Sequence, residues 1–412
     1  MTTDFVVLEQ TRQHLGKAKA QLGSLLGGLV EHRSEGARLW TTDGREFLNC
    51  GGYGVFLLGA RHPKVVDAVA GQLGRHPIGT RGLLEASSAK AAAALAEIAP
   101  PGLTKVYFAG AGTEATEAAL KMAAVQGRHR LIGAGGGYHG KTLGALALTA
   151  NDTYQAPFRG LLHGAVRVPY GDADALDAAL GSDGSDACVV LEPIQGEGGV
   201  RIPSAGYLSR VQRLCRERGA MLVLDEIMTG LGRTGTWWRG DVEQITPDVL
   251  LVGKSLGGGI LPVSAAIATE EAYAAFDADL CLHTSTFSGA PLGMAAAAAT
   301  IDVLREENLV DASARLGERL LAALTEIRDR TCPEQIVDIR GAGALFGLEF
   351  ADGGLAGEFL IEMVDARVII NHSLNAGPVL RLTPPANLGP EDEAWLLEAF
   401  EKACVRLAAN AF

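Results

Sequence analysis

The run Ala220-Met221-Leu222-Val223-Leu224 is followed directly by Asp225 and Glu226. Five apolar residues without an alternating polar pattern are typical of a strand that is buried on both faces, as in a parallel sheet. Three similar runs occur at residues 105–109, 187–191 and 249–252. The four runs together predict a central sheet whose strands are fully buried.

Helical periodicity separates these runs. Apolar residues recur on one helical face from residue 115 to 123 and again from 208 to 215. Strands that alternate with helices predict an α/β fold with a doubly wound, mostly parallel sheet. Because 412 residues are too many for one core, we assign residues 61–305 to a large domain. Residues 1–60 and 306–412 are expected to form one smaller α+β domain together.

Functional residue types follow each run. The first run leads into Gly110-Ala111-Gly112-Thr113, the second into Glu192, the third into Asp225 and the fourth into Gly253-Lys254. The carboxyl ends of parallel strands meet at one edge of the sheet, where ligands bind. We therefore expect a glycine-rich loop, two acids and a lysine at one site.

These residue types suit one cofactor. Backbone amides at a helix N-terminus bind phosphate, although a tight turn alone would also account for the glycines. A lysine in an apolar setting has a lowered pKa and becomes a nucleophile, whereas most lysines at strand ends are surface residues. Pyridoxal phosphate (PLP) needs a lysine for its Schiff base and an acid beside its pyridine nitrogen. The sequence thus favours Lys254 and Asp225 for these two roles.

A dinucleotide-binding oxidoreductase is a rival interpretation, because Gly110 to Ala115 also fits G-x-G-x-x-A. The dinucleotide-binding fold requires an acidic residue about 20 residues further on, which binds the ribose. The next expected strand, residues 130–134, ends without one, and no Asp or Glu occurs between Glu117 and Asp152. The dinucleotide interpretation is correspondingly weak.

Composition narrows the class of protein further. The net charge of −12 makes nucleic acid an improbable partner. Six scattered cysteines without a CxxC pair indicate free thiols and neither disulfides nor a metal site. The first residues do not resemble a signal peptide, and no apolar stretch is long enough to cross a bilayer. We expect a cytoplasmic protein that binds no membrane and no metal.

Seven short motifs are spaced across the chain. They are Leu57-Leu58-Gly59-Ala60-Arg61-His62-Pro63, Gly112-Thr113-Glu114-Ala115, Tyr138-His139-Gly140, Glu192-Pro193-Ile194-Gln195-Gly196-Glu197-Gly198-Gly199, Asp225-Glu226, Gly253-Lys254 and Thr284-Ser285-Thr286-Phe287. Together these motifs resemble class III aminotransferases of the ornithine, acetylornithine, putrescine and 4-aminobutyrate type, which are fold-type I PLP enzymes. The resemblance extends from about Leu39 to Leu407.

The resemblance implies a role for each candidate residue. Lys254 would form the internal aldimine and Asp225 would pair with the pyridine nitrogen. Substrates would be an amine donor and a 2-oxo acid acceptor, and the protein would be a homodimer with shared active sites. The remaining implied cofactor contacts are Gly112, Thr113, Tyr138, His139, Glu192, Met228 and, across the dimer interface, Thr286. The implied substrate contacts are Tyr53, Glu197 and Arg381, with Arg381 binding a carboxylate and Glu197 pairing with it when an amine end is bound.

The chain departs from the family where polar residues are usual. Ala111, Met228, Ala290 and Ala60 replace polar side chains of typical members. The leading hypothesis is an aminotransferase that moves an amino group from a terminal amine or ω-amino acid to a 2-oxo acid. An aminomutase, a decarboxylase or a carbon–carbon bond-forming PLP enzyme remains the alternative. A non-catalytic PLP-binding regulator is disfavoured, because no DNA-binding segment is evident.

Overall fold

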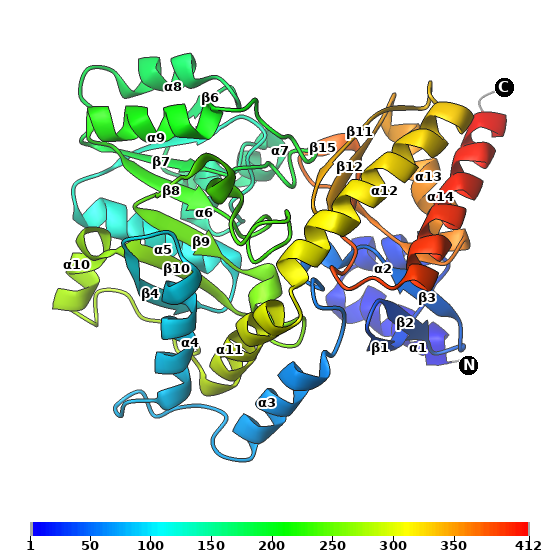
Figure 1. Ribbon diagram of the computed structural model, residues 1–412, viewed down its shortest axis with the longest axis horizontal. Helices are drawn as coiled ribbons and strands as arrows, with labels where there is room; N and C mark the ends of the chain where they lie inside the picture. The colour runs from blue at the N-terminus through cyan, green and yellow to red at the C-terminus, as the bar shows by residue number, and fades with distance from the viewer. Residues whose placement is uncertain (1–2, 411–412) are drawn as a thin grey trace.

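The computed structural model describes residues 3–410, and its largest sheet has seven strands in the order β4-β10-β9-β8-β7-β5-β6 (Figure 1). β10 is antiparallel to β4 and β9, and the other neighbouring strands are parallel. The predicted doubly wound, mostly parallel sheet is therefore confirmed. Its strands are β4 (Leu103–Ala109), β5 (Arg130–Ala134), β6 (Ala165–Val168), β7 (Ala187–Leu191), β8 (Met221–Asp225), β9 (Val249–Val252) and β10 (Ser264–Thr269).

Burial follows the position of each strand in the sheet. Every residue of β7, β8 and β9 is buried, as the continuous apolar runs predict. β4 is different, because it lies at the edge and pairs only with β10. Thr104 is exposed and the next three residues are partly exposed. The expectation that this strand is fully buried is wrong, since its run alone does not reveal that it has one neighbour.

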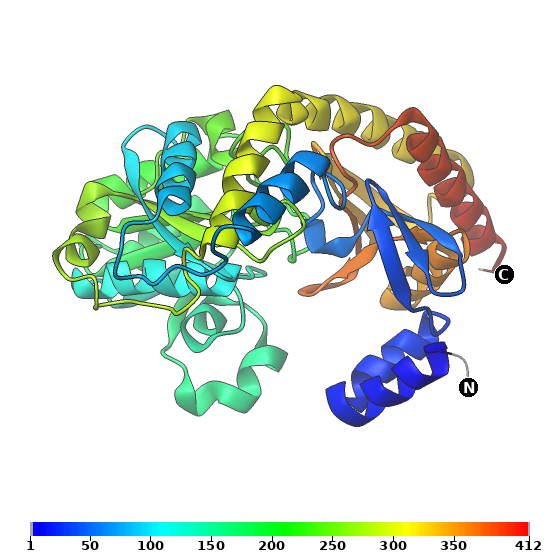
Figure 2. The ribbon, with the colours of Figure 1, turned by 90° about the horizontal axis from the view of Figure 1, so that it is seen from below.

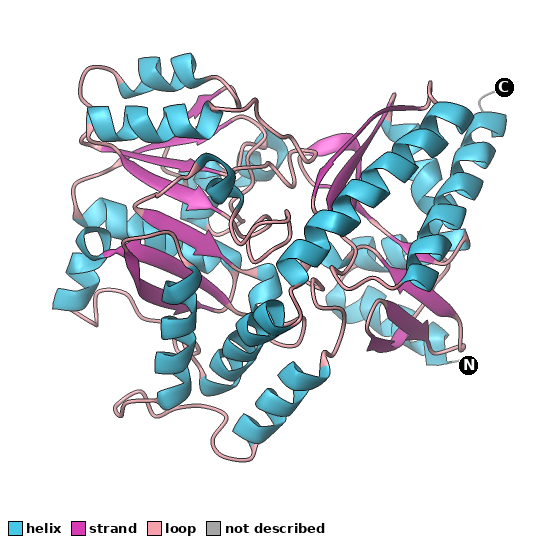
Figure 3. Cartoon of the chain, viewed as in Figure 1, coloured by secondary structure: helices cyan, strands magenta, loops and turns pink. Residues whose placement is uncertain are grey.

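Helices cover both faces of this sheet (Figure 3). α5 (Gly112–Val125) and α10 (Glu270–Ala278) share a hydrophobic cluster with Val223 of β8, whereas α9 (Tyr207–Arg218) and α11 (Pro291–Glu306) share another with Leu222. Successive strand residues point to opposite faces, so each buried strand feeds both clusters. The helices α3 (Pro63–Leu73), α4 (Ala86–Ile98), α6 (Leu143–Leu148), α7 (Asp152–Gln155) and α8 (Ala173–Leu180) complete this part, with the short helices η3 (Ala156–Leu161), η4 (Arg239–Glu243) and η5 (Lys254–Gly257).

The two ends of the chain meet beside this sheet (Figure 1). β13 from the C-terminal part pairs in parallel with β3 from the N-terminal part, so one four-stranded sheet contains both ends. Its strands are β1 (Glu31–Glu35), β2 (Arg38–Thr41), β3 (Glu46–Asn49) and β13 (Val368–Ile369). A second four-stranded sheet contains β11 (Ile336–Ala342), β12 (Leu345–Phe350), β15 (Ala376–Leu382) and β14 (Asn371–Ser373).

A separate hydrophobic cluster holds these end segments together. Leu48 of β3 packs there with Phe346 and Phe350 of β12 and with Phe359 and Phe400 of the covering helices. Figure 2 shows the N-terminal helices projecting from the body. The domain boundaries at residues 60 and 305 stay a prediction. The helices of this part are α1 (Thr3–Gln10), η1 (Thr11–Leu15), α2 (Lys17–Leu25), η2 (Gly52–Gly54), α12 (Leu309–Thr331), α13 (Gly353–Asp365) and α14 (Pro390–Asn410).

Within residues 3–410, no helix combines the length and the apolar character that a membrane span requires.

Candidate functional site

A cavity of about 350 Å³ lies where β7, β8 and β9 end and α5 begins. This is the edge of the sheet at which the sequence predicts a site, and the volume suits a small-molecule ligand. Nine of the predicted site residues line this cavity, together with Gly140, Lys141 and Ile227. The lining consists of Gly112, Thr113, Tyr138, His139, Gly140, Lys141, Glu192, Glu197, Asp225, Ile227, Met228 and Lys254.

Lys254 enters this cavity directly after β9. Its backbone φ of 44° lies in the left-handed region, which non-glycine residues rarely adopt, so the surrounding structure holds it there. Burial lowers the pKa of Lys254, and the positive charge of Arg381 lowers it further, against the opposing carboxylates. A larger share of neutral amine follows at neutral pH, which is the nucleophilic form.

Asp225 and His139 form a buried pair. The Asp225 Oδ2 atom lies 2.7 Å from His139 Nδ1, and Asp225 Oδ1 accepts the amide of Ile227 at 3.1 Å. Burial by itself would lower the pKa of His139, but the hydrogen bond to Asp225 and nearby negative charge outweigh it, and the pKa is raised. This arrangement fixes the direction of a buried carboxylate at the end of β8.

Glu192 braces the loops on the other side of the cavity. Its Oε1 accepts the amide of Tyr138 at 2.9 Å, and its Oε2 accepts the amide of Gly196 at 3.2 Å. Burial raises the pKa of Glu192 to about 7, and the charge of Asp225 adds to this effect. Glu192 therefore holds two backbone segments that border the cavity.

The N-terminus of α5 offers unused hydrogen-bond donors. Within residues 3–410, neither the Gly112 amide nor the Thr113 amide has an acceptor. A Cβ atom at Gly112 would lie 2.9 Å from Ile227 Cδ1, so a larger residue would collide with the loop after β8. The Thr113 hydroxyl lies 2.6 Å from that of Thr142. Free amides and hydroxyls at the start of a helix are a typical phosphate site.

Arg381 and Glu197 form a buried ion pair at the cavity, in which Glu197 lines the wall and Arg381 lies beside it. Arg381 Nη1 lies 2.8 Å from Glu197 Oε1 and donates to Gly196 O at 3.2 Å. Arg381 Nε and Nη2 have no partner among the described residues. The charge of Arg381 lowers the pKa of Glu197 in spite of burial, which acts in the opposite direction. Arg381 therefore keeps hydrogen-bond donors free beside the site.

Three predicted residues do not line this cavity, namely Arg381, which pairs with Glu197 beside it, and Tyr53 and Thr286. Tyr53 is 50 % exposed, adopts a φ of 54° and does not line the cavity. Thr286 is exposed and lines a surface hollow with Arg81 and Tyr107. Met228, in contrast, lines the cavity and is 6 % exposed. Tyr53 and Thr286 thus stay predictions that this chain by itself does not test.

Two basic residues near the site were not anticipated. Lys141 lines the cavity, and its Nζ lies 3.7 Å from the centre of the Tyr154 ring. Its position directly after the motif Tyr138-His139-Gly140 could have predicted that it lies near the site.

Arg233 is fully buried and donates to the carbonyl oxygens of Gly54, Ala344 and Pro384. Burial lowers the pKa of Arg233 to about 9. No sequence pattern predicts the neighbours of Arg233, because they come from three distant segments.

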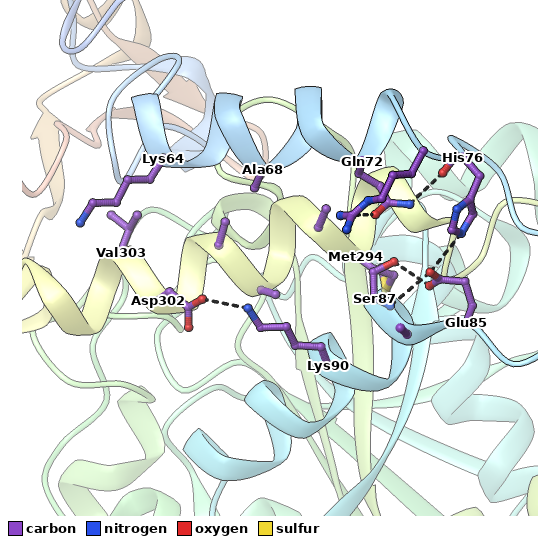
Figure 4. Close-up of a pocket in the computed structure, with 15 residues that line it drawn as sticks. Lys64, Ala68, Gln72, His76, Glu85, Ser87, Lys90, Met294, Asp302 and Val303 are labelled. Atoms are coloured by element: carbon purple, nitrogen blue, oxygen red, sulfur yellow. Dashed lines mark hydrogen bonds and ion pairs between the residues drawn. The ribbon is translucent and has the colours of Figure 1, made fainter.

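A second pocket, of about 470 Å³, lies between α3, α4 and α11 (Figure 4). Alanine side chains such as Ala68 form much of its wall, and charged residues surround it. Figure 4 shows Lys90 directed at Asp302, and His76 and Ser87 at Glu85. This pocket is separate from the residues that follow the strands of the large sheet.

Known proteins share both the sequence pattern and the fold. The family model "Aminotransferase class-III" matches residues 24–404. The ornithine aminotransferase from Toxoplasma gondii is 29% identical, with 100% of this chain and 97% of that chain covered and a TM-score of 0.92. An adenosylmethionine-8-amino-7-oxononanoate aminotransferase from Methanocaldococcus jannaschii is 25% identical, with 98% and 99% covered and a TM-score of 0.89. The omega transaminase from Pseudomonas jessenii in complex with PMP shares the fold at 23% identity, 95% and 96% coverage and a TM-score of 0.86.

The match spans most of the chain, so the protein belongs to the class III aminotransferase family. It is therefore a PLP-dependent transferase, as the resemblance implies. The residues of the cavity fit this cofactor on their own chemistry: free amides at the start of α5 suit a phosphate, and Lys254 has a lowered pKa. A buried carboxylate at Asp225 suits a protonated ring nitrogen.

Proposed function

We propose that this aminotransferase moves an amino group from a terminal amine or ω-amino acid, of the ornithine, putrescine or 4-aminobutyrate class, to a 2-oxo acid. The observation that carries this proposal is the buried Arg381 beside the Lys254 cavity, with two unpartnered N–H groups and a single acidic partner, Glu197. A guanidinium with free donors is suited to a bidentate carboxylate contact. The paired state suits an amine end, and the open state suits the carboxylate of a 2-oxo acid.

Each residue of the cavity has one proposed task towards the cofactor. Lys254 would bind it covalently, Gly112 and Thr113 would hold its phosphate, and Asp225 would pair with its ring nitrogen. Tyr138 would cover the ring face. When bound, PLP supplies an electron sink for the negative charge that develops as the substrate carbon loses its proton.

Lys254 is also the proposed proton carrier. Because burial lowers its pKa, a larger share of the Nζ amine is neutral and can take the proton from the substrate carbon. The same amine can return that proton when the amino group is delivered to the acceptor. His139 and Glu192 act indirectly, since they hold Asp225 and the Tyr138 loop in place.

Lys141 supports an amine donor that also carries a carboxylate. It lines the cavity and contacts the Tyr154 ring, and no acidic side chain pairs with it among the described residues. An unpaired cation at a cavity attracts a carboxylate. We therefore favour an ω-amino acid over a simple diamine as the donor.

A homodimer is part of the proposal. Thr286 lines surface hollows together with Leu83, Leu84 and Leu280, which are 78%, 105% and 79% exposed. Phe287, the next residue, is 68% exposed. Such a group of exposed apolar side chains indicates a protein interface. Thr286 would then reach the cofactor phosphate of the partner, which light scattering and a Thr286→Ala variant can test.

Single-turnover measurement of the two half-reactions tests the assignment of Arg381. Arg381→Ala should slow the 2-oxo acid half-reaction far more than the amine half-reaction, because a buried charged contact is worth about 2 to 5 kcal/mol. Equal losses in both half-reactions would contradict the alternating site. No loss in either would remove Arg381 from the site.

One observation keeps another PLP reaction as the second candidate. Met228 brings an apolar side chain to the cavity where typical members carry a polar one. An aminomutase, a decarboxylase or a carbon–carbon bond-forming enzyme would not consume a 2-oxo acid acceptor. Turnover that continues at full rate without any added 2-oxo acid would therefore favour this second candidate.

A further inference from the structure

The turn between β14 and β15, Leu374 and Asn375, contacts Glu197 of the ion pair. The amide of Leu374 donates to Glu197 Oε2 at 3.0 Å, and the amide of Asn375 donates to Glu197 O at 2.9 Å. Glu197 Oε1 is held by Arg381, which lies on the same hairpin in β15. Both oxygens of the Glu197 carboxylate are thus bound by one hairpin.

Asn375 ties this turn to the loops of the large sheet. Its Nδ2 donates to the carbonyl oxygens of Gly137 at 2.9 Å and Gly136 at 3.3 Å. Its Oδ1 accepts from Asn151 Nδ2 at 3.0 Å. These residues adjoin Tyr138, which lines the cavity. The Asn375 side chain thus hydrogen-bonds the turn to the segment that borders the cavity.

The same turn also braces Lys141. Tyr154 OH donates to Leu374 O at 3.2 Å, and the Tyr154 ring lies under the Lys141 ammonium. The turn therefore contacts Glu197, which pairs with Arg381, and Tyr154, which packs against Lys141. Arg381 and Lys141 are the two basic groups to which we assign substrate carboxylates.

These contacts have an energetic consequence. Arg381 is fully buried and only Glu197 of the pair lines the cavity, so the free Nε and Nη2 groups of Arg381 reach a substrate carboxylate only if the Glu197 side chain moves aside. While the Leu374 amide holds Glu197 Oε2, the carboxylate must break that hydrogen bond as well before it turns away. The Leu374 amide therefore stabilises the closed pair and raises the free energy of the open state.

We propose that Leu374 and Asn375 form a specificity latch, a pair of positioning residues that hold Glu197 on Arg381 and so set how readily a substrate carboxylate is bound. The latch rests on the proposed function, because it acts through Arg381. Neither Leu374 nor Asn375 lines the cavity, so both would act through Glu197.

Two substitutions at Leu374 isolate the amide. Leu374→Pro removes the N–H group that donates to Glu197, whereas Leu374→Ala keeps it. Leu374 is the first residue of a two-residue connection between the paired Ser373 and Ala376, and it does not lie at positive φ, which proline cannot adopt. The probe is glutarate, a dicarboxylate that cannot transfer an amino group, titrated into the holoenzyme by calorimetry.

We expect Leu374→Pro to bind glutarate about threefold to tenfold more tightly, which corresponds to one net hydrogen bond. Leu374→Ala should bind glutarate like the wild type. Single-turnover rates of Leu374→Pro should shift by a similar factor towards the 2-oxo acid half-reaction. Unchanged glutarate affinity, or an equal fall in both half-reactions, would overturn the latch.

A second variant keeps the test valid if the proline variant fails to fold. Asn375→Ala should tighten glutarate binding in the same direction, because the turn loses its anchor. Its matched control is Asn387→Ala, which removes one side-chain bond to the Leu58 carbonyl away from the turn and should leave both half-reactions unchanged. A lower melting temperature for Asn375→Ala without any change in glutarate affinity would overturn the latch.

Arg381→Ala separates the failure of the latch from the failure of the proposed function. If this variant weakens glutarate binding while Leu374→Pro and Asn375→Ala do not tighten it, the carboxylate site stands and the latch is wrong. If Arg381→Ala leaves glutarate binding unchanged, the carboxylate site is wrong and the latch is overturned with it.

Discussion

The Lys254 cavity and the pocket between α3, α4 and α11 differ in a way that their size does not predict. The second pocket is larger, at about 470 Å³ against about 350 Å³. Around it, Lys90 pairs with Asp302, and Glu85 accepts hydrogen bonds from Ser87 and Ser88. In the Lys254 cavity the amides of Gly112 and Thr113 have no acceptor among the described residues.

The carboxyl groups of the two pockets illustrate the difference. Burial raises the pKa of Glu192 in the first cavity to about 7. Glu85 in the second pocket experiences the same kind of effect, but hydrogen bonds from Ser87 and Ser88 outweigh it and lower the pKa of Glu85 to about 2. Desolvation outweighs the hydrogen bonds of Glu192, whereas the hydrogen bonds of Glu85 outweigh its desolvation, and strongly desolvated acids of the first kind gather at functional sites. We therefore expect function to depend on the smaller cavity.

The largest expected effect is the loss of Lys254. Lys254→Ala should lower turnover by at least about 10³-fold, because both the covalent link and the proton carrier are removed. Steady-state rates with a panel of amine donors measure this effect. Borohydride reduction followed by peptide mapping is the control. A wild-type rate, or a label on another lysine, would contradict the assignment.

Asp225→Asn should be the next largest effect. The neutral amide cannot stabilise a protonated ring nitrogen, and the charged partner of His139 is lost as well. We expect turnover to fall by about 10²- to 10³-fold while the cofactor stays bound. Absorbance titration of cofactor binding accompanies the rate measurement. Nearly normal turnover would show that the buried carboxylate has another purpose.

The pH dependence of stability distinguishes the two carboxyl groups directly. Because its pKa is raised from 4.5 to about 7, folded Glu192 retains a proton that the unfolded chain loses. Its contribution to stability is therefore present at low pH and is lost as the pH rises through about 7. We expect the free energy of unfolding of Glu192→Gln, measured by urea on the cofactor-free protein, to increase relative to that of the wild type between pH 5 and 8, by on the order of 1–3 kcal/mol.

Glu85→Gln is the matched control for that experiment. The pKa of Glu85 is lowered, so its contribution is present above the unfolded value and is lost only as the pH falls towards about 2. The difference between Glu85→Gln and the wild type should hence be constant from pH 5 to 8. If the free energies of unfolding of the two variants changed with pH in the same way, the electrostatic difference between the two pockets would be contradicted.

The smallest expected effect belongs to the second pocket. Lys90→Ala breaks an ion pair at 3.4 Å in which both side chains are largely exposed. We expect turnover within about twofold of the wild type and a change in the free energy of unfolding below about 1 kcal/mol. Compared with Lys254→Ala, this variant removes the same side chain from the rim of a larger pocket. A large loss of turnover would make that pocket part of the site.

Much of the catalytic edge could be predicted from sequence, because it depends on local pattern. The apolar runs of β7, β8 and β9 identify buried strands, and the residue after each strand lies at one edge of a parallel sheet. Asp225, Glu192 and Lys254 consequently meet where expected. The helix α5, which begins at Gly112, is likewise predicted by the helical spacing of its apolar residues.

Only the tertiary structure decided the pairings. Arg381 and Glu197 come from distant parts of the chain, as do His139 and Asp225, and no periodicity in the sequence encodes a contact between them. The edge position of β4, the separation of Thr286 from the Lys254 cavity and the contact of Leu374 with Glu197 were decided in the same way. Sequence alone determined the types of reactive group and the edge of the sheet that carries them. Packing determined which groups are desolvated and which are paired, because both depend on segments that meet only in the folded chain.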